Sequence, residues 1–237
     1  MLWLIVAAML VFASPVSAAS LNVAPVLLEV TAPGAATVLT LRNDEDRPLN
    51  VQIRVFGWQQ ADGQDHLVST QDVVVSPPMA VLPPGAEQVV RVLRVSKRPV
   101  AGEESYRVLV DELPDAAQRR NGRVKVVLRY SIPVFFAQPA VAAARVNWSI
   151  VERNGSWLVE AINSGGRRLR IANLMLKDNA GRTLVQQPGL VGYVLPGASV
   201  RWPVGSVRSV KASTTATLSA DSDMGPIHAP AVVRAGR

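Results

Sequence analysis

The chain lacks cysteine entirely, and its 237 residues include only two histidines, His66 and His228. Without cysteine it has no disulfide, no thiolate nucleophile and no thiolate ligand for zinc or an iron–sulfur cluster. Also missing are a phosphate-binding loop, a dinucleotide fingerprint and the G-x-S-x-G elbow of serine hydrolases. The acidic turn at 44–46 lacks the spaced ligands of a calcium loop. We therefore predict that the protein is not an enzyme and uses no cofactor and no metal ion.

Helical patterns are missing as well. No stretch keeps a 3.6-residue apolar repeat over three turns, and 17 prolines and 16 glycines interrupt the chain. Apolar and polar residues instead alternate in short segments, as they do in half-buried strands. The clearest segments are 37–42, 49–55, 88–94 and 106–110. Turn residues such as Asp62-Gly63 separate these segments, so the sequence predicts an all-β fold of the sandwich type.

A second series of short strands begins after Pro139. Segments 147–151 and 157–161 flank Asn154-Gly155, which is a strong hairpin signal. The alternation continues at 169–176, 183–185, 199–202 and 216–218. A change of composition at 140–144 is typical of a linker, and one domain usually takes ~100–200 residues. We therefore predict two domains, 20–139 and 140–237.

The first 19 residues carry no charged side chain and predict a secretory signal peptide. A short apolar run, Leu2 to Ala13, is broken by Pro15, and small residues follow at Val16-Ser17-Ala18. The alternative is a membrane anchor, but the run is shorter than the ~20 residues that span a bilayer. We expect cleavage after residues 1–19, an exported mature chain that starts near Ala19 or Ser20, and no integral membrane segment.

One expected strand, 123–136, is unusually long, because strands usually have ~5–6 residues. The residues that share one of its faces are Val124, Val126, Leu128, Tyr130 and Ile132. Two interpretations remain open. In the first, the strand is central and this row belongs to the core. In the second, it is an edge strand that offers the row to a partner by strand addition, which would suit the missing N–H of Pro133.

Six short motifs follow one another in an order and spacing that resemble the periplasmic pilus chaperone family. They are Ser20 to Asn22 with Pro25-Val26, Leu39 to Asn43, Val55 to Trp58, Ser76 to Val92 with its Pro-Pro and Pro-Gly turns, Glu104 to Pro114, and Ile132 to Pro139. Looser echoes follow at 163–165, 195–197 and 223–225. The stretches 106–114 and 132–136 are most similar to the archaic or alternative branch of the family.

The resemblance implies two immunoglobulin-like β-sandwich domains in tandem, shaped like a boomerang, with a cleft between them. It implies a chaperone in the periplasm of a Gram-negative bacterium that stabilises pilus subunits by donor-strand complementation and delivers them to an outer-membrane usher. Pilus subunits lack their last strand, and the chaperone lends its own. The residues that would plug the subunit are Val124, Val126, Leu128, Tyr130 and Ile132. Self-association of the free protein is left open. The net charge of +7 is dispersed, and export argues against nucleic acid as a partner.

Some expected family residues are absent. Common members hold the terminal carboxylate of the subunit with an arginine and a lysine, but this sequence has Pro25 and Pro133 at those positions. Other bases could serve, because arginine binds carboxylates strongly. The candidates are Arg129, Arg91 and Arg107, each with the alternative of a solvated side chain.

For the ion network between the domains, the resemblance points to Glu104 and Asp223. Ala137 replaces the family arginine of that network. The turn that carries Arg167 and Arg168 is interpreted as a turn with solvated side chains.

Two other classes of function stay in view. A structural or adhesive β-sandwich subunit of a surface organelle would normally carry an N-terminal donor extension or a missing strand, whereas this chain has a long internal strand. An exported hydrolase would need a catalytic constellation that the sequence lacks.

Overall fold

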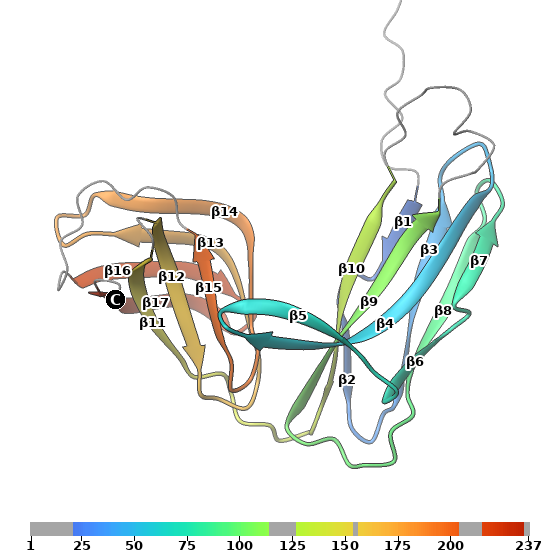
Figure 1. Ribbon diagram of the computed structural model, residues 1–237, viewed down its shortest axis with the longest axis horizontal. Helices are drawn as coiled ribbons and strands as arrows, with labels where there is room; N and C mark the ends of the chain where they lie inside the picture. The colour runs from blue at the N-terminus through green and yellow to red at the C-terminus, as the bar shows by residue number, and fades with distance from the viewer. Residues whose placement is uncertain (1–20, 114–126, 154–155, 204–214, 235–237) are drawn as a thin grey trace, which may run out of the picture.

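The computed structural model describes residues 21–113, 127–153, 156–203 and 215–234. Every regular element in these ranges is a β-strand, which confirms the all-β prediction. None of the described residues forms a helix long and apolar enough to cross a membrane. The predicted signal peptide, 1–19, lies outside the described residues. The strands group into two lobes that meet at an angle (Figure 1), as expected for a boomerang-shaped pair of domains.

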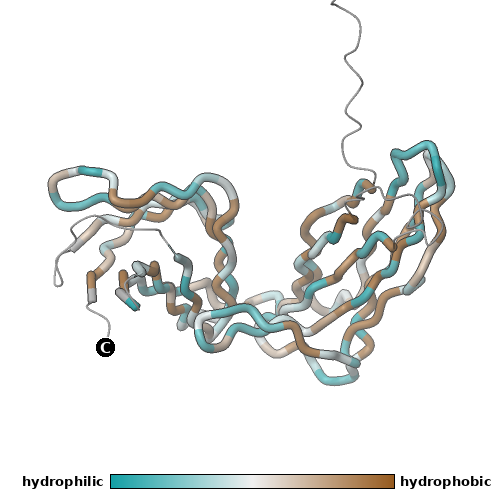
Figure 2. The backbone as a smooth tube through the Cα atoms, turned by 45° about the horizontal axis from the view of Figure 1, so that its top comes forward, coloured by the Kyte–Doolittle hydropathy of each residue, from teal (hydrophilic) through white to brown (hydrophobic). Residues whose placement is uncertain are grey.

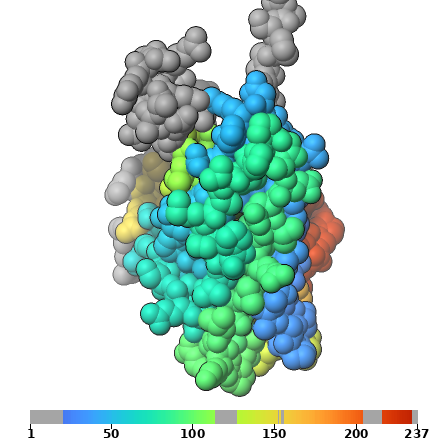
Figure 3. Space-filling view, turned by 90° about the vertical axis from the view of Figure 1, so that its right-hand side faces the viewer, coloured from blue at the N-terminus to red at the C-terminus, as the bar shows by residue number. Residues whose placement is uncertain are grey.

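The first domain is a sandwich of two sheets, with strand orders β1-β3-β8-β6 and β2-β10-β9-β4-β5, where β7 also pairs with β4. Seen from its outer side, this domain covers most of the second (Figure 3). Alternate residues of both sheets point inward into one core, including Leu39 and Leu41 from β3 and Val51 and Ile53 from β4. The strands are β1 (Leu21–Ala24), β2 (Leu28–Thr31), β3 (Ala36–Asn43), β4 (Leu49–Ala61), β5 (Gln64–Ser69), β6 (Val73–Ser76), β7 (Met79–Leu82), β8 (Glu87–Arg94), β9 (Glu103–Leu113) and β10 (Arg129–Ala137).

The second domain is a seven-stranded sheet of order β14-β13-β16-β17-β11-β12-β15. Strands from both ends of this order supply one core, with Val159 of β12 in the same cluster as Leu174 of β13 and Val185 of β14. The sheet therefore folds over itself as a sandwich. The strands are β11 (Val146–Arg153), β12 (Ser156–Asn163), β13 (Leu169–Lys177), β14 (Thr183–Val194), β15 (Ser199–Pro203), β16 (Thr215–Ser222) and β17 (Gly225–Arg234).

The long strand expected at 123–136 is shorter in the structure. β10 begins at Arg129 and runs to Ala137, one residue beyond the expected end. Val127 and Leu128 precede the strand, although the Leu128 carbonyl still accepts a hydrogen bond from Glu112 N–H at 3.0 Å. Residues 123–126, including Val124 and Val126, lie outside the described residues.

Each domain has a buried asparagine at the end of a strand, and the two asparagines make equivalent hydrogen bonds to the backbone. Asn43 ends β3 and Asn163 ends β12, and they are 0% and 1% exposed. Each side-chain amide donates to the carbonyl four residues ahead, at 2.8 Å in both cases. Each also donates to a carbonyl just before a Pro-Gly turn, that of Leu82 at 2.9 Å and that of Val194 at 3.1 Å. The looser motif echoes of the second half therefore mark the same structural feature as their counterparts in the first.

Gly165 allows the linker between the domains to pack against the second domain. A Cβ at this position would lie 2.3 Å from the Ala143 carbonyl oxygen and 2.5 Å from the Arg145 nitrogen. Both atoms belong to the backbone and cannot rotate away, so Gly165→Ala should destabilise the second domain by about 1–3 kcal/mol. Urea unfolding followed by tryptophan fluorescence measures this change.

Gly166→Ala is the matched control, because its closest contact would be 3.2 Å. An equal loss of unfolding free energy in both variants would mean that the close contact of Gly165 with the linker does not determine stability.

Candidate functional site

Among the described residues, the N-terminal half of β10 is paired on one side only. β9 pairs with β10 along its whole length, from Arg129 to Ala137. On the other side, β2 pairs in parallel only with Val134 to Ala137. Among the described residues no strand pairs with 129–133 on that side, so part of their backbone hydrogen-bonding capacity is open to a partner. The edge interpretation of this strand therefore describes its N-terminal half.

The inward face of β10 becomes more exposed toward its N-terminal end. Ile132 is 3% exposed and belongs to the core of the first domain. Tyr130 is half-buried against that core, and its hydroxyl donates to the Leu21 carbonyl. Leu128 is half-buried as well. The three side chains thus lie in a row on the side of β10 that faces the space between the two sheets. Their insertion into a subunit stays a prediction.

The outward face of β10 borders a cleft of about 630 Å³ between the domains. Residues 129–133 of β10 and Arg107 of β9 line it on the first domain, and Val26 and Leu27 lie beside them. The second domain contributes Arg170 of β13, Leu190 and Tyr193 of β14, and Asp223. The cleft therefore combines apolar walls with three arginines and one carboxylate.

Arg129 lies in the cleft but is already paired. Its guanidinium donates to Asp111 on β9, and Arg54 on β4 donates to the same carboxylate at 2.7 Å. Burial alone would raise the pKa of Asp111, but the hydrogen bonds from Arg129 and Arg54 outweigh it and hold this pKa below its usual value. The carboxylate is thus ionised at neutral pH and competes for Arg129.

Arg107 lies deeper in the cleft, with its guanidinium carbon 3.7 Å from the centre of the Trp58 ring. It donates one hydrogen bond to the Ser131 carbonyl at 3.2 Å. No carboxylate of a described residue forms an ion pair with it. Burial lowers the pKa of the Arg107 guanidinium from its usual value, while Asp65 and Tyr193 raise it.

Arg91, the third candidate base, does not reach the cleft. It is exposed on β8, in the sheet β1-β3-β8-β6, which lies on the opposite layer of the sandwich. The sequence motif located Arg91 on a strand but could not say to which sheet that strand belongs. Among the three arginines, the structure therefore brings Arg107 and Arg129 together and leaves Arg91 apart.

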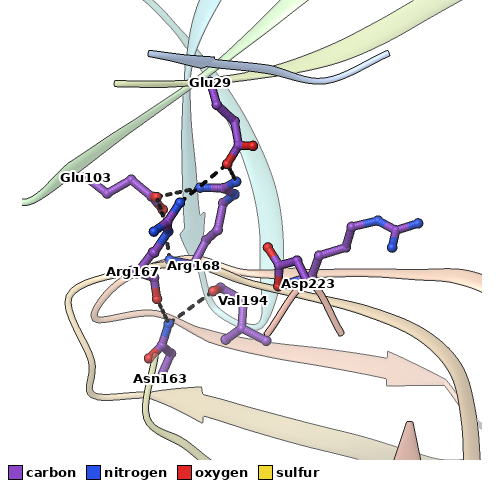
Figure 4. A network of polar contacts seen from close by, with 8 residues as sticks. Glu29, Glu103, Asn163, Arg167, Arg168, Val194 and Asp223 are labelled. Carbon is purple, nitrogen blue, oxygen red and sulfur yellow. Dashed lines mark hydrogen bonds and ion pairs between the residues drawn. The ribbon is translucent and has the colours of Figure 1, made fainter. Parts of the chain in front are cut away.

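An ion network joins the two domains (Figure 4). Arg168 of the second domain is 2% exposed and donates to Glu103 of β9 at 2.5 Å and to Glu29 of β2. Its backbone N–H also donates to Glu103, at 2.8 Å. Its guanidinium lies 3.7 Å above the ring of Phe135 on β10. The interpretation of Arg168 as a solvated turn residue is therefore wrong.

The two acids expected in this network make other contacts. Glu104 accepts hydrogen bonds from Arg94 at 2.8 Å within the first domain. Asp223 lines the cleft and accepts from the Arg170 backbone N–H at 3.0 Å. Neighbouring residues of a strand point to opposite faces, so Glu103 faces the second domain and Glu104 does not. The structure gives the bridging role to Glu29 and Glu103, which the motif comparison did not identify.

Aromatic and backbone contacts complete the interface. Trp58, Phe135 and Tyr193 form a cluster in which Trp58 and Tyr193 meet edge to face, with centroids 5.4 Å apart. The side chain of Gln60 donates to the Tyr193 carbonyl and accepts from Leu195 N–H, both at 2.8 Å.

The hairpin of β4 and β5 also crosses to the second domain. The Gly63 carbonyl, in the turn between β4 and the exposed strand β5, accepts a hydrogen bond from Arg201 N–H at 3.0 Å. The tip of this hairpin is hydrophilic (Figure 2). The described part of the interface is thus held by ionic, aromatic and backbone contacts together.

Comparison with known proteins identifies one family. Residues 20–142 match the family model described as "Pili and flagellar-assembly chaperone, PapD N-terminal domain". No curated protein matches the chain.

Three solved structures are similar in fold. The first is a pre-assembly complex of the chaperone CsuC with the tip adhesion subunit CsuE, from the archaic Csu pili of Acinetobacter baumannii. The matched chain is 24% identical, with a TM-score of 0.71. The match covers 91% of this chain and 99% of the matched chain. The chaperone YadV has 13% identity and a TM-score of 0.62, with 90% and 98% covered. A Salmonella enterica complex of the pilin SafA with the chaperone SafB has 18% identity and a TM-score of 0.59, with 89% and 95% covered.

Proposed function

Because the chain belongs to the family of pilus and flagellar-assembly chaperones, we propose that it binds unfinished pilus subunits and completes their fold with its own strand β10. The observation that carries this proposal is the edge of β10, which pairs with β2 only from Val134 onward. An extended segment of a subunit can pair with residues 129–133. The side chains on the inward face of β10 can then enter the core of the subunit. Solved complexes of similar chaperones with a tip adhesion subunit and with a pilin support subunits as the partners.

Apolar burial supplies most of the binding free energy in this proposal. The residues expected to enter the subunit are Val124, Val126, Leu128, Tyr130 and Ile132. Because Ile132 is already buried in the core of the first domain, the new burial on binding comes from the other four. Each buried apolar side chain contributes about 1.5–3 kcal/mol, so the gross gain is on the order of 10 kcal/mol. Loss of translational freedom and ordering of both chains offset a large part of it.

The terminal carboxylate of the subunit is proposed to bind in the cleft. Pro25 and Pro133, which stand where common members carry bases, cannot hold an anion. Of the predicted anchor residues, Arg107 and Arg129 line the cleft, and Arg107 is the better candidate because Asp111 already neutralises Arg129. A guanidinium in a half-buried site forms strong charge-assisted hydrogen bonds with a carboxylate.

The cellular context follows from the same family. We propose a periplasmic protein with signal peptide 1–19, a subunit-binding domain at 20–139 and a second domain at 140–237, which delivers its cargo to an outer-membrane usher and has no enzymatic activity. The archaic or alternative branch is proposed from the motifs at 106–114 and 132–136. A structural or adhesive subunit, the alternative from sequence, has no observation in its favour, because the matched family consists of chaperones.

Refolding of a pilus subunit tests the proposal. A denatured subunit diluted into buffer with an equimolar amount of the mature protein should stay soluble and elute as a one-to-one complex. Without the protein it should aggregate, because its core and the backbone beside the missing strand are exposed. Equal aggregation with and without the protein would contradict the proposed function.

A further inference from the structure

The guanidinium of Arg107 is held by aromatic rings from both domains. Trp58 of β4 lies under it at 3.7 Å, and the ring centre of Tyr193 on β14 is 5.7 Å away. Trp58 and Tyr193 contact each other at 80° between their planes, so the two rings form a corner around the cation. An arginine stacked on aromatic faces is attracted by their quadrupoles. Its remaining N–H donors stay available in its own plane.

Tyr193 is itself fixed from the first domain. It is 6% exposed, and its backbone carbonyl accepts from the Gln60 side chain at 2.8 Å. The same Gln60 accepts from Leu195 N–H. The position of the Tyr193 ring therefore depends on how the two domains dock.

A second base stands beside Tyr193. Arg170 of β13 is the direct cross-strand partner of Tyr193, and directly opposed residues of an antiparallel pair point to the same face. Both residues line the cleft. The Arg170 side chain forms no ion pair with a described carboxylate, whereas its backbone N–H binds Asp223.

We infer that the second domain is part of the anion-binding site: Tyr193 positions Arg107 against the cleft, and Arg170 supplies a second base for the carboxylate terminus of a bound subunit. This inference rests on the proposed function and names the residues that complete its binding site. The physical reason is preorganisation, because a guanidinium already held by two rings loses little freedom when it binds an anion. If the two domains were not docked, Tyr193 and Arg170 of the second domain would no longer lie beside Arg107.

The test is a double-mutant cycle between Arg107 and Tyr193, with a refolded pilus subunit as the probe. The subunit is prepared with its native C-terminus and with two glycines added, which moves the carboxylate. Arg107→Gln and Tyr193→Leu should each weaken binding of the native subunit about tenfold, and the double variant should be no weaker than Arg107→Gln alone. Tyr193→Phe, which keeps the ring, should bind as the parent does. Arg170→Gln should weaken binding about threefold.

Two controls separate positioning from general loosening of the interface. Leu195→Ala removes a side chain from the same cluster but leaves both rings at Arg107 in place, and it should leave affinity within about twofold. The extended subunit should bind the parent and the Tyr193→Leu variant equally. Independent, additive losses from Arg107→Gln and Tyr193→Leu would overturn the inference. A loss of affinity in Tyr193→Phe as large as that in Tyr193→Leu would also overturn it.

Failure of the proposed function gives a different result. If the parent protein does not bind the subunit at all, the donor-strand proposal itself is wrong. If the parent binds but none of the Arg107, Tyr193 and Arg170 variants changes affinity, the strand proposal survives and the shared anion site is refuted.

Discussion

Capture of a pilus subunit should fall at least a hundredfold when Leu128 is replaced by aspartate, while the chaperone itself remains folded. Leu128 is half-buried just before β10 and does not belong to the core cluster of the first domain, so the free protein tolerates the charge. In the complex, the carboxylate would have to enter an apolar groove without a partner, which costs several kcal/mol. A loss of about 3 kcal/mol already corresponds to a hundredfold in affinity. Titration of refolding subunit with chaperone measures the effect.

Val127→Asp is the matched control, because it places the same charge one residue away on the opposite face. Val127 is 46% exposed, and neighbouring side chains of an extended chain point to opposite sides. The affinity of the Val127→Asp variant for the subunit should stay within a few-fold of the parent's affinity. If both variants bind like the parent, Leu128 does not enter the subunit. If both lose binding equally, the charge acts through general repulsion.

Replacing Arg168 by methionine should lower the free energy of unfolding by about 3 kcal/mol. The change leaves Glu103, whose side chain is 0% exposed, without its main cation. A buried charge that loses its partner typically costs 3–5 kcal/mol. The lower end applies because the residue-168 backbone N–H and Arg167, at 3.6 Å, still contact Glu103. Urea unfolding followed by tryptophan fluorescence gives the value.

Arg167→Met is the control within the same turn. Its side chain is 45% exposed and its contacts with Glu29 and Glu103 are both 3.6 Å long, so the loss should stay within about 0.5 kcal/mol. Similar losses in both variants would show that the buried network does not depend on Arg168.

Much of the fold could be predicted because alternation with period two is a local property. The segments 37–42, 49–55 and 88–94 lie within β3, β4 and β8. Strands without clear alternation escaped prediction. β5 is exposed at every position, and β6 and β7 have four residues each. Local pattern also could not reveal that, within the described part of the chain, β10 is paired on both sides from Val134 onward and on one side before it.

The site was harder to predict because it depends on contacts across the domains. Tyr130 and Ile132 were located by alternation, and Arg107 and Arg129 by charge on neighbouring strands. One predicted acid, Glu104, was displaced by one position from Glu103, and this shift reverses the direction of the side chain. The other, Asp223, binds the Arg170 backbone instead, and Glu29 takes the second place in the network. Nothing near Arg168 in the sequence indicates burial, since its partners Glu29 and Glu103 are 139 and 65 residues away.

Hydrogen exchange along β10 tests the central claim most directly. The amides at 129–132 that do not bond to β9 should exchange rapidly in the free protein and at least a hundredfold more slowly once a refolded subunit is bound, because they then belong to a strand ladder. Unchanged exchange at these amides, with protection appearing on another surface of the chaperone, would contradict the account.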